Sequence, residues 1–124
     1  MSEILQSWLD RYLTAWQTND PADIRALFTP TASYATSPLD PAPWTGVDAI
    51  VDGWLARRDE PRDWSFTGGP LALAGTMGFI EGRTTYTGGR VYANLWVVRL
   101  AADGRAESFV EWFVEPDEPL ASGL

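Results

Sequence analysis

The sequence contains no cysteine and no histidine. Without cysteine, the chain has no disulfide bonds, thiolate metal ligands or thiol nucleophiles. Without histidine, it lacks both the commonest general base of enzymes and the commonest metal ligand of proteins. Any acid–base chemistry must therefore be performed by carboxylates or tyrosine hydroxyls, and we expect the protein to use no metal and no other cofactor.

Long apolar runs and an excess of positive charge are also missing. No segment of about 18 apolar residues is present to span a membrane, and the N-terminus lacks the basic and apolar regions of a signal peptide, so we expect a cytoplasmic protein. Nine Lys and Arg side chains stand against 17 Asp and Glu side chains, for a net charge of −8. This balance argues against nucleic acids and anionic membrane surfaces as partners.

Apolar and aromatic side chains are abundant, at 45% and 13% of the 124 residues. This is enough for one globular domain with its own core, and we assign residues 1–124 to a single domain in which residues 117–124 are expected to be disordered. An apolar stripe with helical spacing predicts a helix over residues 3–18. The stripe consists of Leu5, Trp8, Leu9, Tyr12, Leu13 and Trp16.

Capping signals and prolines divide the segment that follows. Asp20 before Pro21 predicts the start of a short helix that runs to Phe28. A short strand is expected over residues 32–36, then a proline-rich loop, and then a third helix from Thr45. From Trp64 onward the pattern changes to strands, which are predicted at residues 64–74, 76–87, 90–101 and 105–115. Helices followed by a meander of strands indicate an α+β fold.

Two turn signals set the predicted registers of the last three strands. Gly88-Gly89 and Asp103-Gly104 favour two-residue hairpin loops. Such loops would place Glu81 opposite Trp96, and Trp96 opposite Glu111. One sheet face would then carry Phe79, Glu81, Arg83, Asn94, Trp96, Val98, Phe109, Glu111 and Phe113. The other face would be an apolar patch that we expect a second copy of the chain to cover, made of Ile80, Leu95, Val97, Val110 and Trp112.

Three short segments stand out beside this order of elements. They are Thr45-Gly46 at the start of the third helix, the turn Asp103-Gly104-Arg105 and the closing Phe109-Val-Glu-Trp-Phe113. Together, over residues 3–116, they resemble the nuclear transport factor 2-like superfamily and especially its SnoaL-like branch. The resemblance implies a cone-shaped α+β domain in which three N-terminal helices pack on a curved, mostly antiparallel sheet and enclose a pocket. It also implies a homodimer formed through the outer face of the sheet.

Two enzyme groups of this superfamily offer more specific likenesses. Ketosteroid isomerases carry a catalytic Asp near the end of the first strand, where this chain has Thr36, and a Tyr on the first helix to which Tyr12 corresponds. Limonene-epoxide hydrolases carry a Tyr-x-Asn-x-Pro-Leu stretch, which Tyr34-Ala-Thr36-Ser-Pro38-Leu39 resembles with Thr in place of Asn. Glu111 falls where their last-strand Asp activates water. Their Arg-x-Asp pair is represented by Glu81-Gly-Arg83, with the two charges in reversed order.

These likenesses and the predicted registers give one hypothesis for an active site. Glu111 would be the general base, Glu81 its acid partner, and Arg83 the cation that orients both carboxylates. The predicted substrate-binding residues are Tyr12, Trp16, Tyr34, Thr36, Trp44, Tyr92, Asn94, Trp96 and Phe113. The alternative is structural: a salt bridge between Glu81 and Arg83, with Glu111 in a dimer interface or at a solvated rim.

The sequence thus favours a protein with a small-molecule pocket. Our first interpretation is a cofactor-independent acid–base enzyme, of the epoxide hydrolase, cyclase or isomerase type, that acts on a largely apolar, oxygen-bearing substrate. The alternatives are a non-catalytic protein that binds a hydrophobic metabolite and a dimeric scaffold. The expected partners are accordingly a small apolar molecule and a second copy of the chain.

Overall fold

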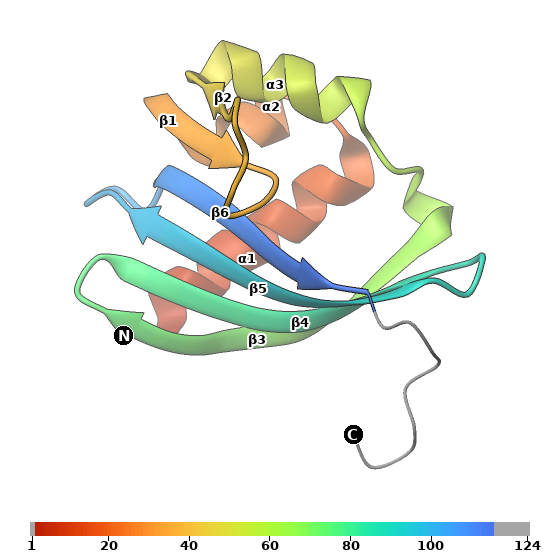
Figure 1. The fold of residues 1–124 in the computed structure, drawn as a ribbon. Coiled ribbons are helices and arrows are strands. Elements are labelled where there is room, and N and C mark those ends of the chain that lie inside the picture. The colour runs from red at the N-terminus through yellow and green to blue at the C-terminus, as the bar shows by residue number, and fades with distance from the viewer. Residues whose placement is uncertain (1, 116–124) are drawn as a thin grey trace.

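The computed structural model describes residues 2–115, so the prediction for residues 117–124 lies outside the described part of the chain. The helices are Ser2–Thr18 (α1), Pro21–Arg25 (α2) and Val47–Ala56 (α3), with a short 3-10 turn at Pro61–Asp63 (η1). The strands are Phe28–Ala35 (β1), Trp44–Thr45 (β2), Trp64–Ala74 (β3), Met77–Tyr86 (β4), Val91–Leu100 (β5) and Ala106–Val114 (β6). They form one curved sheet in the order β2-β1-β6-β5-β4-β3 (Figure 1), in which β1 and β6 run parallel and the other neighbours antiparallel. The predicted α+β fold with a mostly antiparallel sheet is confirmed.

Helix α1 lies along one face of the sheet (Figure 1). Leu5, Trp8 and Leu9 of its predicted stripe are buried, and the ring of Trp8 packs 6.0 Å from that of Phe109 on β6. Trp8 also donates a hydrogen bond of 3.0 Å from its indole nitrogen to the carbonyl of Leu27, just before β1. Trp8 therefore attaches the helix to the start of β1 and to β6. Within residues 2–115, no helix is long and apolar enough to cross a membrane.

The boundary between α2 and β1 differs from the prediction. The carboxylate of Asp20 accepts a hydrogen bond of 2.9 Å from the backbone N–H two residues on, so Asp20 caps α2 as expected. The helix ends at Arg25, and the chain is already in β1 at Phe28. Pro30 has no N–H to donate, and it fits within β1 because the pairing with β6 is irregular between Phe28 and Ser33.

The third helix begins two residues later than predicted. Thr45 belongs to β2 and pairs with Ser33 of β1. Gly46 follows with a φ of 90°, a backbone conformation that favours glycine, and α3 starts at Val47. The ring of Trp44 then packs directly on Gly53 of α3, where a side chain would overlap it.

The hairpin between β4 and β5 has a different loop from the predicted one. Its loop comprises three residues, 87–89, because the backbone N–H of Tyr86 donates to the carbonyl of Arg90 and that of Gly89 to Tyr86. Gly89 takes a φ of 94°, as the last residue of a three-residue hairpin loop commonly does. The predicted two-residue loop was wrong, and the register between the strands is displaced by one residue.

A displacement of one residue moves every side chain of a strand to the opposite face. Ile80 lies opposite Trp96 and is fully buried, whereas Glu81 lies opposite Leu95 and is exposed. The residues whose predicted faces were wrong for this reason are Phe79, Ile80, Glu81 and Arg83. Neither Glu81 nor Arg83 therefore lies on the helix-covered face.

The predicted register between β5 and β6 is confirmed. Trp96 pairs with Glu111 and Asn94 with Phe113. This hairpin also has a three-residue loop, closed by Gly104 with a φ of 87°. The longer loop alone would displace the register by one residue. The pairing shifts by one residue between Arg99 and Leu100, however, and this irregularity restores the predicted register in the rest of the hairpin.

Candidate functional site

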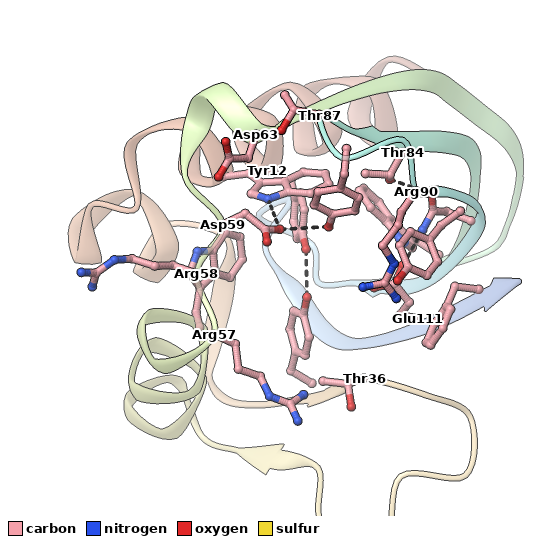
Figure 2. Close-up of a pocket in the computed structure, with 18 of the residues that line it drawn as sticks. Tyr12, Thr36, Arg57, Arg58, Asp59, Asp63, Thr84, Thr87, Arg90 and Glu111 are labelled. Atoms are coloured by element: carbon pink, nitrogen blue, oxygen red, sulfur yellow. Dashed lines mark hydrogen bonds between the residues drawn. The ribbon is translucent and has the colours of Figure 1, made fainter. Parts of the chain in front are cut away.

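Helices α1 and α3, the segment after α3, and the inner faces of the strands surround a pocket of about 1030 Å³ (Figure 2). Its aromatic lining residues are Tyr12, Trp16, Tyr34, Trp44, Trp54, Tyr86, Tyr92, Trp96 and Phe113. Its other lining residues are Thr36, Arg57, Arg58, Asp59, Asp63, Thr84, Thr87, Gly88, Arg90, Asn94 and Glu111. A volume of this size accommodates an organic molecule of several rings.

Glu111 lies on the inner face of β6, and one of its carboxylate oxygens is held by two donors. Oε2 accepts hydrogen bonds of 2.7 Å from the amide nitrogen of Asn94 and 2.8 Å from the indole nitrogen of Trp96. Within residues 2–115, Oε1 accepts no hydrogen bond and no cation pairs with this carboxylate. Glu111 therefore keeps one oxygen for a proton or a ligand.

Burial raises the pKa of Glu111 above its ordinary value of 4.5. The hydrogen bonds from Trp96 and Asn94 lower this pKa, and the negative charge of Asp59 raises it, but desolvation is the largest effect. A carboxylate with a raised pKa is a stronger base than an exposed one, which is the property that a general base requires.

Thr84 on β4 fixes the orientation of Asn94. Its hydroxyl donates a hydrogen bond of 2.8 Å to the amide oxygen of Asn94, and Thr84 is only 2% exposed. With the oxygen of the amide occupied in this way, its nitrogen faces Glu111. The hydrogen-bonded series from Thr84 through Asn94 to Glu111 thus crosses three neighbouring strands.

Two buried tyrosines form a second polar group. The hydroxyl oxygens of Tyr12 on α1 and Tyr34 on β1 are 2.8 Å apart. Burial raises the pKa of both hydroxyls, and the negative charge of Glu111 raises both further. Both are therefore protonated at neutral pH, and since one proton is used within the pair, the other is free to be donated to a ligand oxygen.

Asp59, in the segment between α3 and η1, contributes a second carboxylate. Its Oδ2 accepts hydrogen bonds of 3.1 Å from the indole nitrogen of Trp16 and 3.1 Å from the hydroxyl of Tyr86. Asn19 holds the same segment in place. Its amide nitrogen donates a hydrogen bond to the backbone carbonyl of Asp59, and its amide oxygen accepts one from the indole nitrogen of Trp54. Asp59 thereby joins α1 to β4 at one side of the pocket, and Asn19 joins the same segment to α3.

The loop after β1 forms another side. Asp40 accepts hydrogen bonds from the backbone N–H and the hydroxyl of Thr36, at 3.0 and 3.2 Å, and from the backbone N–H of Ala42. These backbone hydrogen bonds lower the pKa of Asp40. The ring of Trp44 stacks on Tyr34 with centroids 4.9 Å apart. The hydroxyl of Thr36 is thus already used as a donor, whereas Trp44 presents an apolar wall.

Ten of the twelve predicted site residues line the pocket, and their roles remain predictions. They are Tyr12, Trp16, Tyr34, Thr36, Trp44, Tyr92, Asn94, Trp96, Glu111 and Phe113. Glu81 and Arg83 do not, because the register of β4 places them on the outer face. The structural alternative of an ion pair between Glu81 and Arg83 is wrong as well, since none forms within residues 2–115.

Sequence reasoning missed several lining residues. Thr84 and Tyr86 were missed because the register of β4 was wrong. Asp59 and its neighbours Arg57 and Arg58 follow the last turn of α3, where no periodic pattern marks an inward side chain. A short charged run between a helix and a strand resembles an ordinary solvated connection.

Comparisons with known proteins agree with this fold. The model of one family, the SnoaL-like domain, matches residues 9–114. An NTF2-like protein of unknown function from Mesorhizobium loti is 23% identical with a TM-score of 0.70, over 91% of this chain and 93% of that chain. An NTF-2 like protein of unknown function from Burkholderia xenovorans is 15% identical with a TM-score of 0.74, over 95% and 88%. No curated protein matches the sequence.

A third similar structure has a more specific description. It is a ketosteroid isomerase-like protein from Erwinia carotovora, 17% identical with a TM-score of 0.66, over 93% of this chain and 97% of that chain. At identities this low, the three structures show a shared fold but do not show whether any activity is shared.

Proposed function

The chain belongs to the SnoaL-like domain family, within the nuclear transport factor 2-like superfamily, and we propose that it is a cofactor-independent acid–base enzyme with Glu111 as its general base. The observation that carries the proposal is the state of this carboxylate: desolvation raises its pKa, and within residues 2–115 no cation neutralises it. Its substrate is a largely apolar molecule that bears oxygen, because nine of the 20 residues that line the pocket are aromatic.

The proposed chemistry requires only groups of this chain. Oε1 of Glu111 takes a proton from an acidic carbon of the substrate or from a bound water. The free proton of the Tyr12–Tyr34 pair forms a hydrogen bond with the substrate oxygen on which negative charge develops. The carboxyl group of Glu111 then returns the proton to another atom of the substrate or product. This sequence suits an isomerase or a cyclase, and with water as the nucleophile it suits an epoxide hydrolase.

Asn94 and Trp96 hold the base in place during this reaction. Both donate to Oε2, so proton transfer at Oε1 leaves their hydrogen bonds intact. The resemblance to a ketosteroid isomerase-like protein supports an isomerase within this proposal.

A screen of wild-type protein tests the proposal. Epoxides, polyketide-like ketones and terpenoids are incubated with the protein, product formation is followed by mass spectrometry, and binding is followed by thermal shift. At least one ligand that raises the melting temperature should also be converted to product. If the protein converts none of the ligands that raise its melting temperature, the enzyme proposal is contradicted.

One observation favours a second candidate, a protein that binds a hydrophobic metabolite without converting it. Three polar residues of the pocket wall are already hydrogen-bonded within the protein, because Thr84 pairs with Asn94 and Thr36 with Asp40 of the loop after β1. The nine aromatic lining residues then remain for contact with a ligand, which suits binding by apolar contact. Ligands that stabilise the protein without turnover would select this candidate.

A further inference from the structure

All cationic side chains of this chain are arginines, and three of them, Arg57, Arg58 and Arg90, line the pocket. Such a cluster is unexpected in a chain with a net charge of −8. The three differ in whether their guanidinium groups are free for a ligand.

Arg90 is already engaged by a carboxylate. Its guanidinium forms two hydrogen bonds with Glu115, at 3.0 and 3.1 Å, and lies 5.3 Å from the ring centroid of Tyr92. Figure 2 shows the side chain of Arg58 directed away from the other labelled residues. Neither residue is therefore well placed to bind a ligand inside the pocket.

Arg57 differs from both. It directly follows α3 as its C-cap residue, and within residues 2–115 its side chain forms no hydrogen bond and no ion pair. Figure 2 shows its guanidinium reaching toward Thr36, on the side of the pocket formed by the loop after β1. Its positive charge lowers the pKa of Tyr34, which lines the pocket, and of Asp40 in the loop after β1. The carboxylate of Asp40 is itself satisfied by Thr36 and Ala42.

Three other lining residues carry the opposite charge, namely Asp59, Asp63 and Glu111. Within residues 2–115, none of these three carboxylates is paired with a cation. Their charges repel an anionic group in that part of the pocket, and Figure 2 shows all three away from the guanidinium of Arg57. An anionic ligand group is therefore favoured next to Arg57.

We propose that Arg57 selects an amphipathic organic acid, whose carboxylate binds the guanidinium at the mouth of the pocket while its apolar, oxygen-bearing body lies against the aromatic rings beside Glu111. The proposal rests on the proposed function of the same pocket and names the class of its substrate. A guanidinium binds a carboxylate through two parallel hydrogen bonds, which would fix the orientation of the ligand as well as add affinity.

A matched pair of probes tests the proposal, namely 2-naphthoate and 2-naphthamide, which have the same ring system and nearly the same shape. Their dissociation constants are measured by calorimetry and by quenching of tryptophan fluorescence. The proteins are wild type, Arg57→Gln, Arg57→Lys and the control Arg62→Gln, since Arg62 is exposed on η1 and does not line the pocket.

Wild type and Arg62→Gln should bind the acid about threefold more tightly than the amide at low salt, as expected for a charge pair at an exposed arginine. Arg57→Gln should bind the two probes equally and leave the affinity for the amide unchanged. Arg57→Lys should recover part of the preference for the acid.

Two results would overturn the role of Arg57. One is that wild type binds the acid and the amide equally well. The other is that Arg57→Gln prefers the acid over the amide as strongly as Arg62→Gln does. Either result leaves the proposed base chemistry intact, because the amide still reports a working pocket. If no variant binds either probe, an aryl acid is excluded as the ligand class and the proposal fails. The broader substrate screen then decides the function of the pocket separately.

Discussion

Asn94 donates a hydrogen bond of 2.7 Å to Glu111, and the orientation of its amide is set by Thr84 on the next strand. The same carboxylate oxygen accepts from Trp96, so Oε2 is fixed, whereas Oε1 accepts no hydrogen bond within residues 2–115. The position of the proposed base therefore depends on a buried threonine that does not contact it.

Replacing this threonine should impair turnover. Thr84→Val keeps the shape of the side chain but leaves the amide oxygen of Asn94 without its donor, so the amide is free to rotate and its donation to Glu111 weakens. We expect kcat to fall about tenfold with little change in KM. Thr84→Ser, which retains the hydroxyl, should recover most of the activity.

Thr85→Val is the control, because Thr85 is exposed and lies next in the same strand. Equal losses in Thr84→Val and Thr85→Val, or no recovery in Thr84→Ser, would show that the hydroxyl of Thr84 does not position the base.

The pH dependence of kcat/KM should report the ionisation of Glu111. Activity should rise with pH as this carboxyl loses its proton, with a midpoint above 4.5, because desolvation raises its pKa. Trp96→Phe removes a hydrogen bond that lowers this pKa, so the midpoint should move to still higher pH. A midpoint that stays fixed or moves to lower pH in Trp96→Phe is incompatible with Glu111 as the titrating base.

Stability should depend on the same ionisation. The pKa of Glu111 is raised in the folded state, so its contribution to stability is fully present below the pKa of the unfolded chain and is lost as pH rises through the folded-state pKa. Glu111→Gln should therefore resist urea better than wild type near pH 7, and this difference should shrink as the pH falls toward about 3. A destabilised Glu111→Gln at neutral pH would contradict the assigned direction of the pKa shift.

The outer face of the sheet should form a homodimer interface. Phe79, Leu95, Val97, Val110 and Trp112 are on this face, and Trp112 is 49% exposed in the single chain. Trp112→Asp should convert a dimer to a monomer in light scattering at micromolar concentration, because it places a charge within an apolar contact. Leu39→Asp, at a loop residue that is 89% exposed, should leave the dimer intact. Wild type that is monomeric under these conditions would refute the interface.

Periodicity made most of the fold predictable. The apolar stripe of α1 identified Leu5, Trp8, Leu9 and Tyr12, which the structure buries, and the last four strands lie within a few residues of their predicted bounds. The start of β1 near Pro30 was harder to predict from the sequence, because β1 can contain a proline only where its pairing with the neighbouring strand is irregular.

The face of β4 was mispredicted although the sequence contained a better signal. Charged side chains at positions 81 and 83 alternate with Ile80 and two glycines, which is the ordinary pattern of a strand with one solvated face. The glycines lie where inner-face side chains have no room, since Leu5 packs over Gly78 and Phe66 over Gly82. The assumed loop length outweighed this pattern in the prediction, and loop length is set by backbone geometry that a Gly-Gly pair does not specify.

The candidate site was only partly predictable for a related reason. Glu111, Asn94 and Trp96 lie on regular strands whose register the sequence indicated correctly. Asp59 and Arg57 reach the pocket from a connection, where the direction of a side chain depends on tertiary contacts such as those of Asn19.

The role of Glu111 as general base is tested most directly by the kcat of Glu111→Gln on a substrate found in the screen, beside Glu107→Gln as an exposed control on the same strand. Glutamine keeps an oxygen that can accept from Asn94 and Trp96 but cannot take a proton. We predict that Glu111→Gln loses about 10² to 10⁴ in kcat while its affinity for the ligand and the activity of Glu107→Gln are unchanged. A kcat of Glu111→Gln within about twofold of that of Glu107→Gln would contradict the assignment of Glu111 as the base.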